Sequence, residues 1–216
     1  MDPHSSESPQ GPKGLLLGHL KTLGVSFTDH PTPKFLNMED CRRERGAEIP
    51  GVFCKNLLVR DKKKQFFLVC AVEDTEVDLN KLRKELGAAR CLTFATPEEM
   101  AEKLQVIPGG VSPLAAWNFK DAPDVKVILD QRIMEAELAN FHPLDLESTL
   151  TLSPQDLLRF LASVGVEPVV HNFSPDKSPS SSTTASTTAT PSPSSLSSPS
   201  SPSLSLAPLC DTLQVE

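Results

Sequence analysis

Between Val52 and Asp74, two apolar runs flank a short charged connection, and few folds can hold such a segment other than as a buried β-hairpin. The runs span residues 57–60 and 65–72, with Asp61 and three lysines between them. Stretches rich in Val, Phe and Leu on either side of such a connection predict two antiparallel strands. The second run is almost wholly apolar, which predicts a strand covered on both faces.

Helical and extended patterns alternate along the rest of the chain. Helix signals include an N-cap at Asp78 and a capping box in which Thr96 precedes Glu99 by three residues. Helices are expected at residues 15–23, 37–45, 79–86, 97–104, part of 130–140, and 154–164. The other strands are expected at 25–29, 90–94, 114–118, 125–129, 150–152 and 166–170. A sharp turn is expected at 30–33. This order predicts a mixed α/β fold, with a largely antiparallel sheet and surrounding helices.

The C-terminal segment differs sharply from the rest in composition. No charged residue occurs from Ser178 to Cys210, where Ser, Pro and Thr dominate. Such a segment cannot bury enough apolar surface to offset its ordering entropy, which predicts disorder. We therefore expect a flexible N-terminus at residues 1–13, one domain at 14–173, and a disordered tail at 174–216.

Charge and cysteine usage narrow the class of protein. A net charge of −7 argues against bulk electrostatic attraction to nucleic acid. The five cysteines show no CxxC spacing, which favours reduced thiols in a cytoplasmic protein. No HExxH motif or Cys/His cluster occurs, so neither a metal nor another cofactor is expected. No apolar run approaches the roughly 20 residues that span a bilayer, so no membrane partner is expected.

A local basic surface is compatible with the net negative charge of the protein. Eight basic residues fall within 23 positions, and a solvated face is the default interpretation of such a run. If they share one side of the fold, they form a basic patch that can contact successive phosphates of a nucleic-acid backbone. These residues are Arg42, Arg43, Arg45, Lys55, Arg60, Lys62, Lys63 and Lys64.

Three further positions are candidates for chemistry, each with a plainer alternative. Lys55 could activate Cys54 as a nucleophile, but strand neighbours face opposite ways, so a buried inert cysteine is favoured. The glycines at 109 and 110 could bring backbone N–H groups close to a ligand, or form an ordinary turn. His142, before a proline, is either a site residue or a structural histidine.

Four segments together resemble a known family. They are GVFCKNL at 51–57, LVCAVED at 68–74, PGGVSPL at 108–114 and NFHPL at 140–144. In this order and spacing they are similar to the YbaK/prolyl-tRNA synthetase-associated editing domain, and most similar to its free-standing, ProXp-ala-type members. The resemblance covers residues 14–173 and excludes the tail.

The resemblance implies a metal-independent hydrolase that proofreads translation. Its substrate would be a mischarged tRNA, with alanine wrongly attached to the proline tRNA. A synthetase pocket built for proline cannot strongly exclude a smaller amino acid, since missing methylenes are worth only about 1–3 kcal/mol. A second site that admits alanine and excludes proline completes the selection. Prolyl-tRNA synthetase or other translation factors are further expected partners.

The resemblance also implies roles for named residues. Lys55 would place the terminal adenosine phosphate or polarise the ester, and Asn56 would hydrogen-bond the substrate; on a strand, both can do so only at a bulge or a strand end. His142 would border the side-chain pocket. The loop that receives the amino acid and supplies backbone N–H donors would comprise Gly109, Gly110, Val111, Ser112 and Pro113. The tRNA contacts would come from Arg42, Arg43, Arg45, Lys62, Lys63 and Lys64.

Two other functions remain open at this point. The fold could serve as a non-catalytic module that binds tRNA or a synthetase without turnover. The tail could be the working part of a scaffold protein, with Ser-Pro sites suited to phosphorylation.

Overall fold

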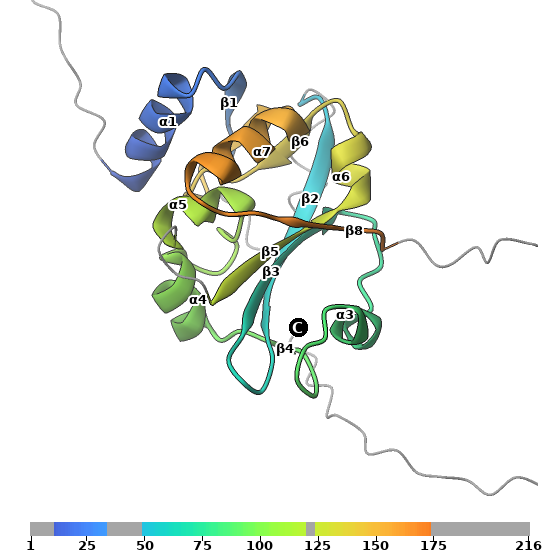
Figure 1. Cartoon of the computed structure of the whole chain (residues 1–216). Helices are drawn as coiled ribbons and strands as arrows, with labels where there is room; N and C mark the ends of the chain where they lie inside the picture. The colour runs from blue at the N-terminus through green and yellow to red at the C-terminus, as the bar shows by residue number, and fades with distance from the viewer. Residues whose placement is uncertain (1–10, 34–48, 120–123, 174–216) are drawn as a thin grey trace, which may run out of the picture. The chain divides into compact units, whose positions relative to one another are not determined.

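The computed structural model describes residues 11–33, 49–119 and 124–173, which form a sheet with helices packed around it (Figure 1). The helices are α1 (Pro12–Thr22), α3 (Leu79–Glu85), α4 (Pro97–Leu104), η1 (Pro113–Ala115, a 3-10 turn), α5 (Ala116–Phe119), α6 (Gln131–Glu135) and α7 (Pro154–Ser163). The strands are β1 (Phe27–Pro31), β2 (Val52–Arg60), β3 (Phe66–Val72), β4 (Thr93–Phe94), β5 (Val125–Asp130), β6 (Ala139–Phe141), β7 (Ser148–Leu152) and β8 (Val169–His171).

Two expectations lie outside these residues: the helix at 37–45 and the tail. Three of the expected tRNA contacts, Arg42, Arg43 and Arg45, lie there too.

The predicted hairpin is present as β2 and β3. The two strands pair antiparallel without interruption from Cys54 opposite Val72 to Arg60 opposite Phe66. Every residue of β3 is buried, which confirms the prediction of a strand covered on both faces. However, β2 begins at Val52, five residues earlier than the apolar run at 57–60 indicated.

The sheet combines both kinds of strand pairing. Its order is β1-β7-β6-β2-β3-β5-β8, and β4 adds to β2 beyond this path. The pairs β1–β7, β6–β7, β2–β3 and β2–β4 are antiparallel, whereas β2–β6, β3–β5 and β5–β8 are parallel. The fold is therefore mixed α/β, as predicted.

Two apolar clusters lie on the two faces of the hairpin. The larger cluster contains Leu58 and Cys70 together with residues of α1, α7 and the 111–119 segment. The smaller cluster contains Val59 and Phe67 together with Leu82 of α3. We call these the large-cluster face and the α3 face, because the alternation of β2 assigns each of its side chains to one of them.

Local helix signals were read correctly where a cap was present. The Thr96 hydroxyl accepts from the Glu99 N–H while the Glu99 carboxylate accepts from the Thr96 N–H, which completes the predicted capping box. Asp78 caps α3, and Ser153 caps α7 in the same way.

Three local predictions were wrong. Residues 114–118 form η1 and α5 rather than a strand, because Ser112 caps this turn and Pro113 begins it. All residues from 111 to 116 are buried, and periodicity cannot separate a buried strand from a buried helix over so short a run. The strand expected at 90–94 is only Thr93–Phe94, and the expected turn at 30–33 begins later because β1 extends to Pro31.

No helix within the described ranges is long and apolar enough to cross a bilayer. The first helix begins at Pro12, two residues before the expected domain boundary.

Candidate functional site

A short stretch of β2 has a strand on only one side. Along one edge, β3 pairs with β2 throughout residues 54–60. Along the other edge, β6 pairs only with Val52 and Phe53, and β4 pairs only with Val59 and Arg60. No strand of the described chain pairs with residues 54–57 on that edge. We call these residues the β2 window, and Lys55 and Asn56 lie within it.

Lys55 and Asn56 point to opposite faces of the sheet. Lys55 lies opposite Ala71 and Asn56 opposite Cys70 in an unbroken register, so no bulge turns them to one side. Asn56 shares the large-cluster face with Leu58, whereas Lys55 shares the α3 face with Val59. The bulge or strand end that would let both contact substrate from one side is absent from this register.

Asn56 carries an unusual polar atom. Its amide Oδ1 is buried and has no hydrogen-bond partner among the described residues. A buried acceptor without a partner is uncommon in proteins, because the desolvation of a polar group is costly unless a hydrogen bond replaces water. A ligand with an N–H or O–H donor would satisfy it.

The loop that contains Gly109 and Gly110 covers the same face as Asn56. Gly109 has φ of 91°, and the Gly110 N–H donates to the Ile107 carbonyl at 3.0 Å to close a tight turn. The next two residues, Val111 and Ser112, are buried, and their backbone N–H groups donate to no described residue. Two successive unpaired N–H groups form a site suited to a carbonyl oxygen or an anion.

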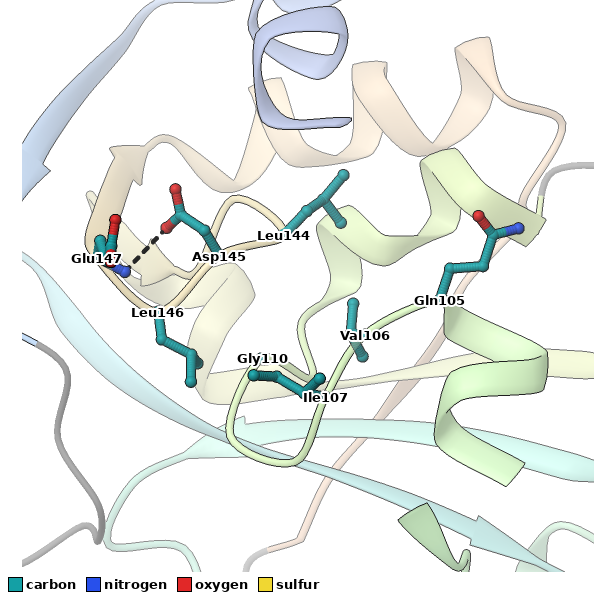
Figure 2. Close-up of a pocket in the computed structure, with 8 residues that line it drawn as sticks. All are labelled: Gln105, Val106, Ile107, Gly110, Leu144, Asp145, Leu146 and Glu147. Atoms are coloured by element: carbon teal, nitrogen blue, oxygen red, sulfur yellow. Dashed lines mark hydrogen bonds between the residues drawn. The ribbon is translucent and has the colours of Figure 1, made fainter. Parts of the chain in front are cut away.

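A pocket of about 320 Å³ lies between this turn and the segment that follows His142 (Figure 2). The pocket is lined by Gln105, Val106, Ile107, Gly110, Leu144, Asp145, Leu146 and Glu147. A Cβ built on Gly109 would lie 3.4 Å from Leu146 Cδ2, so the turn packs closely against that wall. The structure therefore brings together the glycine loop and the segment after His142, which the sequence separates by some thirty residues.

His142 directly follows β6. The pairing of β6 with β2 joins Val52 to Ala139 and Phe53 to Asn140 and ends before Lys55 and His142. The His142 Nδ1 lies 2.9 Å from the Ser148 carbonyl oxygen. Because a carbonyl only accepts, Nδ1 carries the proton, and in the neutral ring Nε2 is an acceptor.

The segment that holds His142 is tied to α1 by an ionic network. Lys13 Nζ lies 3.1 Å from Asp29 Oδ2 and 3.3 Å from Asp145 Oδ2, and it donates to the Ser148 hydroxyl. Asp145 Oδ1 in turn accepts from the backbone N–H groups of Glu147 and Ser148. Lys13 therefore holds the turn whose Ser148 carbonyl orients His142.

Two residues that sequence reasoning missed adjoin this segment. His30 Nε2 and Thr32 Oγ1 are buried and have no partner within the described part of the chain. Pro31, between them, pairs with Ser148, and the Thr32 N–H donates to the Glu147 carbonyl. The His-Pro-Thr-Pro sequence at 30–33 indicated only a turn, and nothing local marks its side chains as unsatisfied.

The thiol beside Lys55 is not activated. Burial, followed by the negative charge of Asp130, raises the pKa of Cys54 far above its ordinary value. A thiol with a raised pKa is protonated at neutral pH and is a poor nucleophile. In the described ranges no three His, Cys, Asp or Glu side chains are grouped so as to hold a metal ion.

Comparison with known proteins gives one consistent family. The aminoacyl-tRNA editing domain matches residues 32–160. A Bos taurus prolyl-tRNA synthetase associated domain-containing protein 1 is 40% identical over 129 residues, which are 58% of this chain and 74% of the relative. A prolyl-tRNA editing protein of Acetoanaerobium sticklandii is 33% identical over 112 residues, 51% of this chain and 67% of the relative.

The fold is also found among solved structures. One described as a candidate trans-editing enzyme for prolyl-tRNA synthetase superposes with a TM-score of 0.55 and 22% identity. The superposition covers 75% of this chain and 96% of the other.

Proposed function

This chain belongs to the aminoacyl-tRNA editing domain family, and from that premise we propose that it hydrolyses alanine from mischarged proline tRNA, acting in trans. The proline part of the proposal rests on the names of its relatives, one a prolyl-tRNA editing protein. The chemistry rests on the unsatisfied groups of the site.

The observation that carries the proposal is a set of buried polar groups on one face of the sheet that have no partner among the described residues. Asn56 provides an unpaired acceptor, while Val111 and Ser112 provide unpaired N–H donors. An aminoacyl ester presents complementary groups, since its α-ammonium donates and its carbonyl oxygen accepts. A structural loop would leave neither kind of group without a partner.

In the proposed reaction, a water molecule adds to the ester carbonyl carbon. The Val111 and Ser112 N–H groups stabilise the negative charge that develops on the carbonyl oxygen. Asn56 Oδ1 accepts from the α-ammonium and so fixes the amino acid relative to that pair of donors. The ribose oxygen leaves with a proton, and the products are free alanine and uncharged tRNA. Because the ester is already reactive, orientation and oxyanion stabilisation suffice.

Lys55 receives a different role from Asn56 in this proposal. Its ammonium group lies on the α3 face, so it is suited to a phosphate of the terminal nucleotides rather than to the ester carbonyl. We infer that His142, which directly follows β6, borders the same terminal nucleotide.

The test is a deacylation assay with alanyl-, seryl-, cysteinyl- and prolyl-tRNA at substoichiometric protein. We expect turnover of alanyl-tRNA(Pro) and no turnover of prolyl-tRNA(Pro). Lys55→Ala is expected to raise KM more than it lowers kcat, with Lys55→Arg close to wild type, because a phosphate contact acts in substrate binding. Binding of tRNA without any release of amino acid would replace the proposal by the non-catalytic module, and full activity of Lys55→Ala would remove the role of Lys55.

A further inference from the structure

A second hollow, of about 360 Å³, lies between the tip of the β2–β3 hairpin and the C-terminal end of α3. We call it the tip hollow. It is lined by Asp61, Lys63, Lys64, Gln65, Phe67, Leu86, Gly87, Ala88, Asp124 and Lys126. Lys126 comes from β5, so strands distant in sequence add a lysine to those of the hairpin tip.

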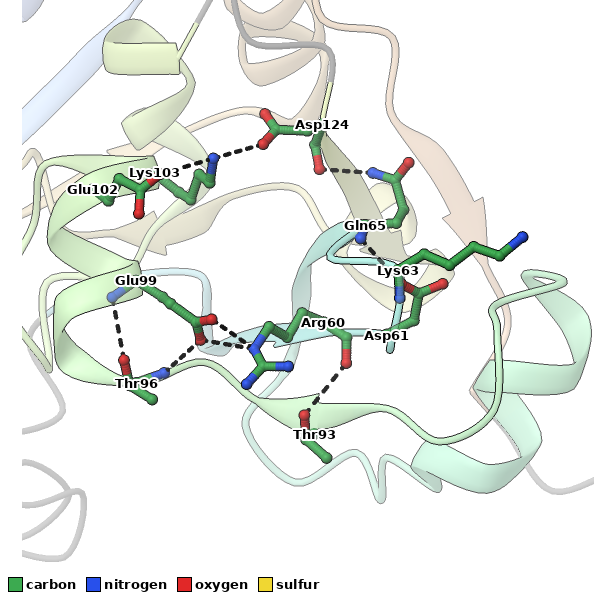
Figure 3. Close-up of polar contacts among 10 residues, drawn as sticks. All are labelled: Arg60, Asp61, Lys63, Gln65, Thr93, Thr96, Glu99, Glu102, Lys103 and Asp124. Carbon is green, nitrogen blue, oxygen red and sulfur yellow. Dashed lines mark hydrogen bonds and ion pairs between the residues drawn. The ribbon is translucent and has the colours of Figure 1, made fainter.

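Both carboxylates of the tip hollow are satisfied within the protein (Figure 3). Asp61 Oδ1 accepts from the Lys63 and Gln65 N–H groups at 2.8 and 3.0 Å, and Asp61 Oδ2 accepts from the Ala89 N–H at 2.9 Å. Asp124 Oδ2 lies 2.7 Å from Lys103 Nζ. Neither carboxylate is therefore available to pair with the lysines at the rim.

The lysines of the tip hollow have no such partners. Lys63, Lys64 and Lys126 are exposed, and none forms an ion pair with another described residue. Lys64 also has φ of 61°, a left-handed conformation that is costly for a residue with a side chain. Asp61 and Glu99 lie within electrostatic range of Lys63 and Lys64. In a protein with a net charge of −7, three exposed ammonium groups around one hollow, none ion-paired to a described residue, still form a local site for an anion.

The tip hollow lies on the same face of the sheet as Lys55. Lys55 and Val59 both lie on the α3 face of β2. Val59 pairs with Phe67, and Phe67 pairs with Lys126, so these two lining residues of the hollow lie on the same face. Lys55 precedes Asp61 by six residues, which at the rise of a β-strand corresponds to about 20 Å. At about 3.4 Å per stacked nucleotide, that length corresponds to about six nucleotides.

We propose that the tip hollow binds a backbone phosphate of the tRNA acceptor strand, about six nucleotides from the aminoacylated end. The proposal rests on the proposed function, because the length is counted from an aminoacylated end held at the β2 window. Phosphate contacts of this kind position an RNA without reading its sequence. The tip hollow would therefore set affinity and register, and leave the choice of amino acid to the window.

The experiment compares two triple variants of the full chain. Lys63→Ala/Lys64→Ala/Lys126→Ala removes the charges, and Lys63→Arg/Lys64→Arg/Lys126→Arg keeps them. For alanyl-tRNA(Pro), we expect the alanine variant to raise KM about tenfold and to reduce the slope of log K against log salt by about 1, with the arginine variant near wild type. For an alanylated oligonucleotide limited to the single-stranded 3′ end, all three proteins should have the same kcat/KM.

The outcomes separate this proposal from the proposed function. Equal KM and equal salt slopes for tRNA in all three proteins would overturn the phosphate site while leaving deacylation intact. An equal loss on tRNA and on the short oligonucleotide would also overturn it, because the lysines would then act at the window. If the wild type releases no amino acid, the proposed function fails, and direct binding of uncharged tRNA to the same three proteins still decides the tip hollow.

Discussion

The β2 window and the tip of the hairpin both bury a polar atom, one within β2 and one directly after it, but the two atoms differ in their hydrogen-bond partners. At the tip, the Asp61 carboxylate is 4% exposed and accepts three backbone N–H groups. At the window, Asn56 Oδ1 is buried and accepts from no described residue. The first arrangement stabilises the fold, whereas the second leaves an acceptor without a partner among the described residues, which is the group that we propose binds substrate. Four substitutions test this difference.

The largest expected effect is at the window. Asn56→Leu is expected to lower kcat/KM for alanyl-tRNA(Pro) about 100-fold, because the α-ammonium loses the acceptor that orients the ester. The free energy of unfolding should stay the same or rise, because an apolar group replaces an acceptor that has no partner. Urea denaturation and single-turnover deacylation measure the two quantities. Asn80→Leu on the exposed surface of α3 is the matched control, and a clear loss of stability in Asn56→Leu would show that the amide is structural.

The second prediction concerns Asp61 at the tip of the hairpin, where a substitution should lower stability and leave activity unchanged. Asp61→Ala leaves three N–H groups without their acceptor and should lower the free energy of unfolding by about 2 kcal/mol. Its kcat on the alanylated 3′ oligonucleotide should not change. An Asp61→Ala variant as stable as wild type would contradict the structural role.

Asp61 should also make the stability of the protein depend on pH. Burial raises the pKa of Asp61, but the N–H donors of Ala89, Gln65 and Lys63 outweigh it and hold the pKa below its ordinary 3.8. A carboxyl with a lowered folded-state pKa contributes stability above its unfolded pKa and loses it as pH falls through the folded value. The stability difference between wild type and Asp61→Ala should therefore be full at pH 7 and smaller at pH 3.

A smaller effect is expected from the network that orients His142. Lys13→Met breaks the contacts with Asp29, Asp145 and Ser148, and should lower kcat/KM about fivefold and stability by about 1 kcal/mol or less. Lys21→Met, on an exposed position of the same helix, should change neither. If Lys13→Met lowers stability alone, the network does not act through His142.

The smallest effect is expected at Cys54. Burial keeps its thiol protonated, so Cys54→Ala should retain kcat within about twofold at pH 7. Wild type should also resist iodoacetamide at this position under native conditions, as followed by mass spectrometry. A tenfold loss of kcat in Cys54→Ala would restore the thiol as a participant.

Much of the fold follows from local patterns. The apolar run at 65–72 predicted β3, and the Thr96 capping box predicted the start of α4, because caps and alternation act over a few residues. The run at 114–118 was misassigned because residues 114–116 are all buried, and so short a buried run shows no period. Strand alternation alone also indicated that Lys55 and Asn56 face opposite ways, as the register has them.

By itself, the sequence determined that a buried hairpin carries Lys55 and Asn56, and that the fold is mixed α/β. The tertiary structure alone decided three features of the described residues: β6 and β4 do not pair with residues 54–57, Asn56 Oδ1 has no partner there, and Lys126 joins the lysines of the tip. The physical reason is the range of the interactions. Hydrogen bonds within a turn or a cap are encoded by neighbours, whereas the pairing of β2 with residues about 35 and 87 positions away depends on how the whole sheet closes.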